Sequence, residues 1–186
     1  RECGYTVVLL GSTGDLAKRY IWPALFENSL SLDSIVANDC VSHELVVFGS
    51  SRSPIVDRDA ILAKVLVNTK CNEGDDRCLH MLKMFQKFIR FVQVSKPENY
   101  EKLALGIAVE YEARNLTELG RLVYLSIPPS AYVSTIEHVS NHLKPSRLTW
   151  LRVVLEKPFG RDLSSAINLN RALGELLLEE QVYRID

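Results

Sequence analysis

Short apolar runs alternate along this chain with longer segments in which apolar residues recur every three or four positions. The short runs have the length and β-branched composition of buried strands, and the longer segments have the spacing of one helix face. The runs predict strands at residues 6–10, 44–48, 90–94, 121–127 and 151–155, and a strand-like piece at 181–186. The longer segments predict helices at residues 15–28, 58–68, 79–88, 98–114, 130–143 and 163–180.

This alternation defines the expected fold class. Strands that alternate with helices from end to end predict an α/β fold, in which a doubly wound, mostly parallel, Rossmann-like sheet carries helices on both faces. The 186 residues are enough for a sizeable core. We therefore expect one domain over residues 1–186.

A glycine turn joins the first predicted strand to the first predicted helix. The strand ends at Gly11, Gly14 follows, and Ala17 stands where a third small residue would let the helix pack on the strand. Such a turn leaves the N–H groups of the helix start unpaired and partly positive, which suits a phosphate or pyrophosphate. Two glycines after an apolar run are equally typical of a purely structural turn, so this segment alone leaves both interpretations open.

The end of the second predicted strand bears on the choice of ligand. In a dinucleotide-binding fold, an acidic side chain at this position would bind the ribose hydroxyls and select NAD. The segment Gly49-Ser50-Ser51-Arg52-Ser53 has no acidic residue. The Arg52 guanidinium suits a 2′-phosphate, which it can meet with two parallel hydrogen bonds. A lone loop arginine is by default solvated, but together with the glycine turn it favours NADP.

Four predicted turns fall at the carboxyl ends of the expected parallel strands, at residues 11–14, 49–52, 126–129 and 156–160. Ligands of such sheets bind at this edge, where the order of connections switches, so we expect the four loops to converge on one crevice. Lys157 lies in the last of them. A surface lysine paired with Glu156 is the alternative, and the Pro158-Phe159-Gly160 context favours a fixed geometry.

Composition and charge narrow the function classes. The chain is 47% hydrophobic and 24% charged, with a net charge of −1. These values are ordinary for a soluble globular protein and argue against a nucleic-acid binder. The longest apolar runs have strand length, so no membrane span is expected. The chain opens on Arg1 without a methionine, which suggests processing or an excised piece.

Cysteines, a glycosylation triplet and a histidine pair are the remaining chemical features. The four cysteines form no Cys-x-x-Cys pair, so we expect no zinc site. Cys71 and Cys78 frame a polar surface loop and could form a disulfide or remain free thiols. Asn115-Leu116-Thr117 is an N-glycosylation acceptor if the chain is secretory, and otherwise a chance triplet. His138 and His142 have metal-ligand spacing but no evident third ligand, which favours a solvated or capping role.

Four segments resemble the motifs of the glucose-6-phosphate dehydrogenase family, in the same order. They are Gly11-Ser12-Thr13-Gly14-Asp15-Leu16-Ala17-Lys18, Tyr124-Leu125-Ser126-Ile127-Pro128-Pro129, Glu156-Lys157-Pro158-Phe159-Gly160 and Tyr183-Arg184-Ile185-Asp186. The resemblance covers nearly the whole chain, and the Glu-Lys-Pro-Phe-Gly element is specific. Within the family the chain looks most like the endoplasmic-reticulum hexose-6-phosphate form, because of residues 151–155 and the two-cysteine loop.

The resemblance implies a role for each matching position. Arg52 and Thr13 would hold the 2′-phosphate of NADP, and Tyr124 and Pro128 would lie beside the cofactor. Lys157, whose bond to Pro158 can be cis in this family, would contact both the substrate and the nicotinamide side. Asp186 would orient the histidine base that the family supplies further along the chain. The dinucleotide turn would consist of Gly11, Ser12, Thr13, Gly14, Asp15 and Leu16.

The resemblance also implies an activity. An oxidoreductase of this family transfers a hydride from C1 of glucose 6-phosphate to NADP and gives 6-phosphogluconolactone, in the oxidative pentose phosphate pathway and without a metal. It would be a homodimer at full length, located in the endoplasmic-reticulum lumen or, alternatively, in the cytoplasm. Most of the substrate domain would follow Asp186, so the 186-residue chain alone is expected to be inactive. An NADP-dependent oxidoreductase with another substrate and a noncatalytic dinucleotide-binding module stay open as alternatives.

Overall fold

The computed structural model describes residues 2–31, 40–145 and 149–185. Its centre is a six-stranded sheet in the order β3-β2-β1-β4-β5-β6, and every neighbouring pair of strands is parallel. The predicted doubly wound sheet is thereby confirmed. The strands are β1 (Glu2–Leu10), β2 (Ser42–Ser51), β3 (Ile89–Gln93), β4 (Leu116–Leu125), β5 (Trp150–Glu156) and β6 (Val182–Ile185).

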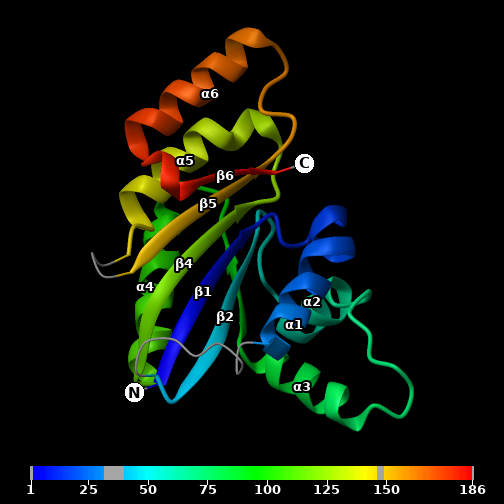
Figure 1. Ribbon diagram of the computed structural model, residues 1–186. Helices are drawn as coiled ribbons and strands as arrows, with labels where there is room; N and C mark the ends of the chain where they lie inside the picture. The colour runs from blue at the N-terminus through cyan, green and yellow to red at the C-terminus, as the bar shows by residue number, and fades with distance from the viewer. Residues whose placement is uncertain (1, 32–39, 146–148, 186) are drawn as a thin grey trace.

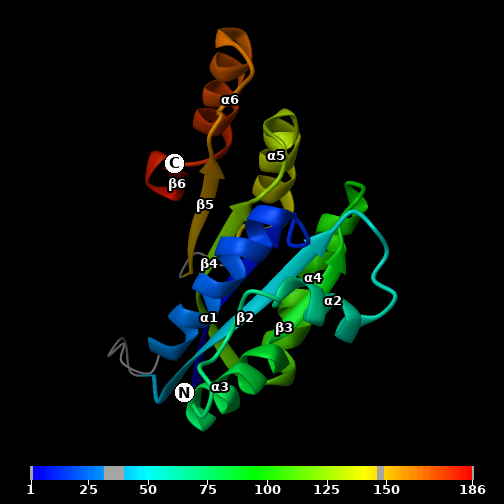
Figure 2. The same ribbon diagram turned by 90° about the vertical axis from the view of Figure 1, so that its right-hand side faces the viewer.

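Helices cover both faces of the sheet (Figures 1 and 2). One face carries the π-helical turn η1 (Ala17–Ile21), α1 (Trp22–Ser31), α2 (Arg58–Val65) and α3 (Asp76–Lys87). The other carries α4 (Glu98–Ala113), α5 (Tyr132–His142) and α6 (Leu163–Leu176). The 3-10 turns η3 (Pro129–Ala131) and η4 (Glu179–Gln181) precede α5 and β6. Among the helices of the described ranges, none is both long and apolar enough to cross a bilayer.

The central strand β1 feeds two hydrophobic cores. Successive side chains of a strand point to opposite faces of its sheet. Val8 and Leu10 therefore enter the core beneath α4, α5 and α6, whereas Val7 and Leu9 enter the core beneath α1, α2 and α3. All four are nearly or fully buried. A continuous apolar run is what a parallel strand with two covered faces requires.

Strand β4 begins at Leu116, well before the predicted start at residue 121. The reason is a tight junction, because Asn115 adopts a positive φ of 52° and turns the chain directly from α4 into the sheet. Gly120, expected to precede the strand, lies inside it. A Cβ at this position would come within 1.9 Å of the Trp150 ring, so a glycine here serves packing rather than a turn.

Two helix starts show how local chemistry sets the boundaries. α3 begins at Asp76, before the predicted residue 79, because the Asp75 carboxylate accepts a hydrogen bond from the Cys78 N–H (2.9 Å). The segment predicted as one helix at residues 15–28 changes its hydrogen-bond pattern at Trp22, because η1 is π-helical and α1 begins at Trp22. Pro23 has no N–H and cannot continue an unbroken ladder of helical hydrogen bonds.

Two disulfides pair all four cysteines. Cys71 and Cys78, which the sequence left open as a disulfide or two free thiols, form a disulfide. Cys3–Cys40 was not predicted, because the two residues are 37 apart in sequence. They meet only because the parallel register of β1 and β2 sets Cys3 opposite His43.

We expect the Cys71→Ser/Cys78→Ser double variant to be less stable by about 2 kcal/mol, because the disulfide restricts the unfolded chain over a short loop. Equilibrium denaturation in non-reducing buffer measures this loss. Reduction of the unaltered protein would also break Cys3–Cys40, so the double variant is the cleaner probe. An unchanged denaturation midpoint would contradict the pairing.

Candidate functional site

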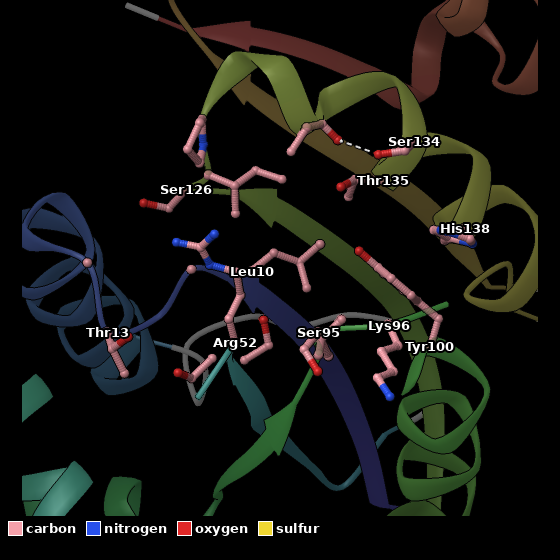
Figure 3. Close-up of a pocket in the computed structure, with 18 of the residues that line it drawn as sticks. Leu10, Thr13, Arg52, Ser95, Lys96, Tyr100, Ser126, Ser134, Thr135 and His138 are labelled. Carbon is pink, nitrogen blue, oxygen red and sulfur yellow. Dashed lines mark hydrogen bonds between the residues drawn. The ribbon is translucent and has the colours of Figure 1, made fainter. Parts of the chain in front are cut away.

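A cavity of about 730 Å³ lies at the carboxyl edge of the sheet (Figure 3). Chain connections run from β1 toward β3 on one side and from β4 toward β6 on the other. The connections therefore separate between β1 and β4, and this switch point is where open parallel sheets bind ligands. The cavity is lined by the loops after β1, β2, β3 and β4, by the first turn of α4 and by the first two turns of α5.

The turn after β1 forms one wall of the cavity. Gly11 has a φ of +82°, and a Cβ on it would lie 2.0 Å from the carbonyl oxygen of Ser126. Only glycine fits, because any side chain would strike the backbone that follows β4. The Gly14 N–H donates to the Gly11 carbonyl oxygen (3.0 Å) and closes the turn. Gly11, Thr13 and Gly14 all line the cavity.

Ser12 anchors this turn from within the protein. Its side chain is fully buried, and its Oγ and backbone N–H both donate to the Ser50 carbonyl oxygen at 2.9 Å. The Trp22 indole N–H donates to the Ser12 carbonyl oxygen (2.8 Å). The turn is thereby held against both β2 and α1. Ser12 does not line the cavity, so any contribution to binding comes through the position of the turn.

Asp15 and Leu16 begin the helical segment after the turn. Both are exposed, and neither side chain lines the cavity. Lys18 forms an ion pair with Asp15 (Nζ to Oδ1, 2.8 Å), and its hydrogen bond and charge lower the pKa of the Asp15 carboxyl. The negative charge of Asp15 is thus offset locally. The N–H groups of this segment are the part that can face an anion.

Arg52 lies directly after β2 and lines the cavity on the same side as Thr13 (Figure 3). Its side chain is exposed. Its carbonyl oxygen accepts a hydrogen bond from the Gln93 Nε2 (3.0 Å), which ties the loop after β2 to the end of β3. Among the described residues that line the cavity, none is Asp or Glu, whereas Arg52 and Lys96 are cationic. The cavity therefore suits an anionic ligand.

The wall opposite Arg52 contains residues that the sequence did not assign to a ligand cavity. The rings of Tyr100 and His138 are stacked with centroids 4.8 Å apart, and Thr135 hydrogen-bonds Tyr100. These three residues and Lys96 line the cavity. Lys96 could have been found, because the predicted strand at 90–94 must end at the same edge as the glycine turn. The others come from the faces of α4 and α5, and their meeting depends on tertiary packing.

His138 belongs to this wall and to no evident metal site. Its ring centroid lies 6.2 Å from that of His142. In the described part of the chain, no group of three or more His, Cys, Asp or Glu residues is placed to hold a metal ion.

A second cluster of predicted residues lies at the ends of β4 and β5. The Tyr124 hydroxyl donates to Glu156 Oε1 (2.6 Å), and the Tyr132 hydroxyl donates to the Glu156 carbonyl oxygen (3.0 Å). Burial, followed by the Glu156 carboxylate, raises the pKa of Tyr124, so this hydroxyl stays protonated. The neighbouring Lys157 is exposed, and its N–H donates to the Ile185 carbonyl oxygen (3.2 Å).

The structure therefore divides the predicted site residues into two groups. Gly11, Thr13, Gly14, Arg52 and Pro128 line the cavity. Ser12, Asp15, Leu16, Tyr124 and Lys157 lie at the same edge of the sheet but do not line it. The peptide bond between Lys157 and Pro158 is cis. Asp186 lies outside the described residues.

The strand order, the glycine turn at the switch point and the anion-suited cavity define a Rossmann-type dinucleotide-binding domain. The sequence model of the glucose-6-phosphate dehydrogenase NAD-binding domain matches residues 8–186. The chain belongs to this family.

Individual relatives agree with this assignment. The chain is 36% identical over 183 residues to the GDH/6PGL endoplasmic bifunctional protein of Oryctolagus cuniculus, covering 97% of the chain and 22% of that protein. It is 35% identical over 186 residues to the chloroplastic glucose-6-phosphate 1-dehydrogenase of Solanum tuberosum, covering 97% and 30%. A solved glucose-6-phosphate dehydrogenase in complex with glucose 6-phosphate superposes with a TM-score of 0.78 at 27% identity, covering all of this chain and 37% of that one. The chain thus spans between 22% and 37% of the length of these relatives.

Proposed function

We propose that residues 1–186 form one cofactor domain and that its cavity binds NADP. The observation that carries this proposal is the position of Arg52, which lines the cavity directly after β2 where an acidic residue would select NAD. A guanidinium there can form two parallel hydrogen bonds with a 2′-phosphate. Thr13 lines the same side and completes this phosphate site.

The rest of the cofactor would extend along the carboxyl edge of the sheet. The pyrophosphate would lie on the turn formed by Gly11, Ser12, Thr13, Gly14, Asp15 and Leu16, where backbone N–H groups can approach it without obstruction by a Cβ. The nicotinamide would lie toward Pro128, Tyr124 and Lys157. When bound, the nicotinamide ring supplies the hydride acceptor.

We further propose that the whole protein oxidises glucose 6-phosphate, or a related hexose 6-phosphate, at C1 to a 6-phosphogluconolactone in the oxidative pentose phosphate pathway. Family membership supports this activity, as does the solved relative with its substrate bound. Lys157 would donate a hydrogen bond to the C1 hydroxyl from the end of β5. Asp186 would orient a histidine base supplied elsewhere in the protein.

The location and assembly of the whole protein are also proposals. We place it in the endoplasmic-reticulum lumen, because the two disulfides suit an oxidising compartment and two relatives are endoplasmic bifunctional proteins. Cytoplasmic relatives at 34% identity make the cytoplasm the alternative. A homodimer is the proposed assembly of the full-length enzyme.

A calorimetric titration with NADP and NAD side by side tests the cofactor proposal. We expect clearly tighter binding of NADP, because only NADP offers the 2′-phosphate to Arg52. Equal affinities for NADP and NAD would show that Arg52 does not select the 2′-phosphate. The domain would then be one that binds both cofactors. If neither dinucleotide binds, the proposed site is wrong.

A further inference from the structure

Asn115 stands at the junction between α4 and β4, at the amino edge of the sheet. It is exposed, and its φ of 52° lies in the left-handed region that asparagine tolerates better than most residues. The triplet Asn115-Leu116-Thr117 is the only Asn-x-Ser/Thr triplet in the sequence, and its middle residue is not proline. The structure therefore places an intact N-glycosylation acceptor on a surface turn.

The residues around the turn keep Asn115 at the surface. The Arg114 guanidinium pairs with the Glu44 and Glu110 carboxylates and lies 4.2 Å from the centroid of the Phe88 ring. Arg114 is thus held against β2, α4 and the end of α3. The Asn115 N–H donates to the Glu112 carbonyl oxygen (3.1 Å), which fixes the backbone of the turn. A large group on the Asn115 side chain would extend into solvent without disturbing these contacts.

The same edge of the sheet carries a marker of an oxidising compartment. Cys3 is the register partner of Thr117 and forms a disulfide with Cys40. The second disulfide joins Cys71 and Cys78. Disulfides of this kind persist in the endoplasmic reticulum and in secreted proteins, which is also where asparagine glycosylation takes place. The acceptor triplet and the disulfides therefore point to the same compartment.

We propose that Asn115 carries an N-linked glycan, an inference that rests on the proposed location in the endoplasmic-reticulum lumen. The donor is an oligosaccharide joined to a lipid diphosphate. The Asn115 Nδ2 forms a bond to the anomeric carbon of the sugar, the bond from that carbon to the diphosphate oxygen breaks, and the amide loses one proton. The lipid diphosphate leaves, and nothing is oxidised or reduced.

The position of Asn115 keeps such a glycan away from the cavity. Figure 1 shows the junction of α4 and β4 beside the start of β1, at the opposite end of the sheet from the strand arrowheads. Ten residues of β4 separate Asn115 from Ser126, which lines the cavity, and at the usual rise of a strand this is roughly 30 Å. The glycan is therefore compatible with cofactor binding.

Expression of the full-length protein in its own type of eukaryotic cell tests this proposal. We expect the unaltered protein to migrate one glycan heavier than Asn115→Gln and Thr117→Ala, and the difference to vanish after treatment with peptide N-glycosidase. Thr117→Ser keeps the acceptor triplet and should keep the glycan. Asn141→Gln alters an exposed asparagine outside any triplet and should migrate like the unaltered protein.

Equal migration of the unaltered protein and Asn115→Gln would overturn the inference. Protease protection of the microsomal fraction then separates the two ways in which it can fail. A protected protein without a glycan at Asn115 disproves the glycan and leaves the location standing. A protein that the protease digests in intact microsomes disproves the location in the endoplasmic-reticulum lumen as well as the glycan. NADP affinity should be the same with and without the glycan.

Discussion

Gly11→Ala is expected to abolish tight dinucleotide binding and to destabilise the domain by about 3 kcal/mol. The added Cβ would lie 2.0 Å from the Ser126 carbonyl oxygen, so either the turn or the backbone after β4 must move. Both segments line the cavity, and a shift of either removes the surface on which the pyrophosphate would lie. Equilibrium denaturation and calorimetric titration with NADP measure the two effects.

Gly74→Ala is the matched control, because Gly74 has nearly the same φ (+81°) but no atom within 4 Å of the position of an added Cβ. We expect Gly74→Ala to lower the stability by about 1 kcal/mol, because alanine disfavours the left-handed backbone conformation. Its Cβ would collide with no other atom. NADP affinity should not change in this variant. If the two alanine variants lose the same stability and both keep NADP binding, the close approach of Gly11 to Ser126 is not what the site requires.

Much of the fold follows from local patterns. The apolar run that ends at Gly11 predicted β1, because a strand covered on both faces cannot alternate with polar residues. Aspartate is a preferred residue just before the first turn of a helix, and the Asp57 and Asp162 side chains accept hydrogen bonds from the first turns of α2 and α6. The switch-point rule predicted that the loops after β1, β2, β4 and β5 would converge on one crevice. The first three line the cavity, whereas no residue of 156–160 does, and the loop after β3 lines it instead.

The features that were missed depend on contacts between distant segments. Cys3 and Cys40 meet only through the register of β1 and β2. The stacked rings of Tyr100 and His138 require the packing of α4 against α5. Ser12 was expected in the dinucleotide turn, but the sequence did not indicate that its side chain would be buried beneath that turn. The spacing of residues along the chain does not predict such contacts, because they depend on how distant segments pack in the folded domain.

Arg52→Gln is expected to weaken NADP binding by about 10- to 100-fold and to leave NAD binding unchanged. A hydrogen bond between charged groups contributes roughly 1.5–3 kcal/mol, which corresponds to this range of affinity. The side chain is exposed, and its loss should hardly change the stability of the fold. Calorimetric titration of the variant with both dinucleotides separates loss of the 2′-phosphate contact from general damage to the site.

Two further variants test whether geometry or charge explains the preference. Arg52→Lys keeps the charge but loses the planar fork, so its affinity for NADP should fall between those of the unaltered protein and Arg52→Gln. Arg77→Gln removes the same charge from an exposed position in the first turn of α3 that does not line the cavity. It should bind NADP normally. If Arg77→Gln weakens NADP binding as much as Arg52→Gln does, the preference arises from overall charge, and the assignment of Arg52 to the 2′-phosphate is wrong.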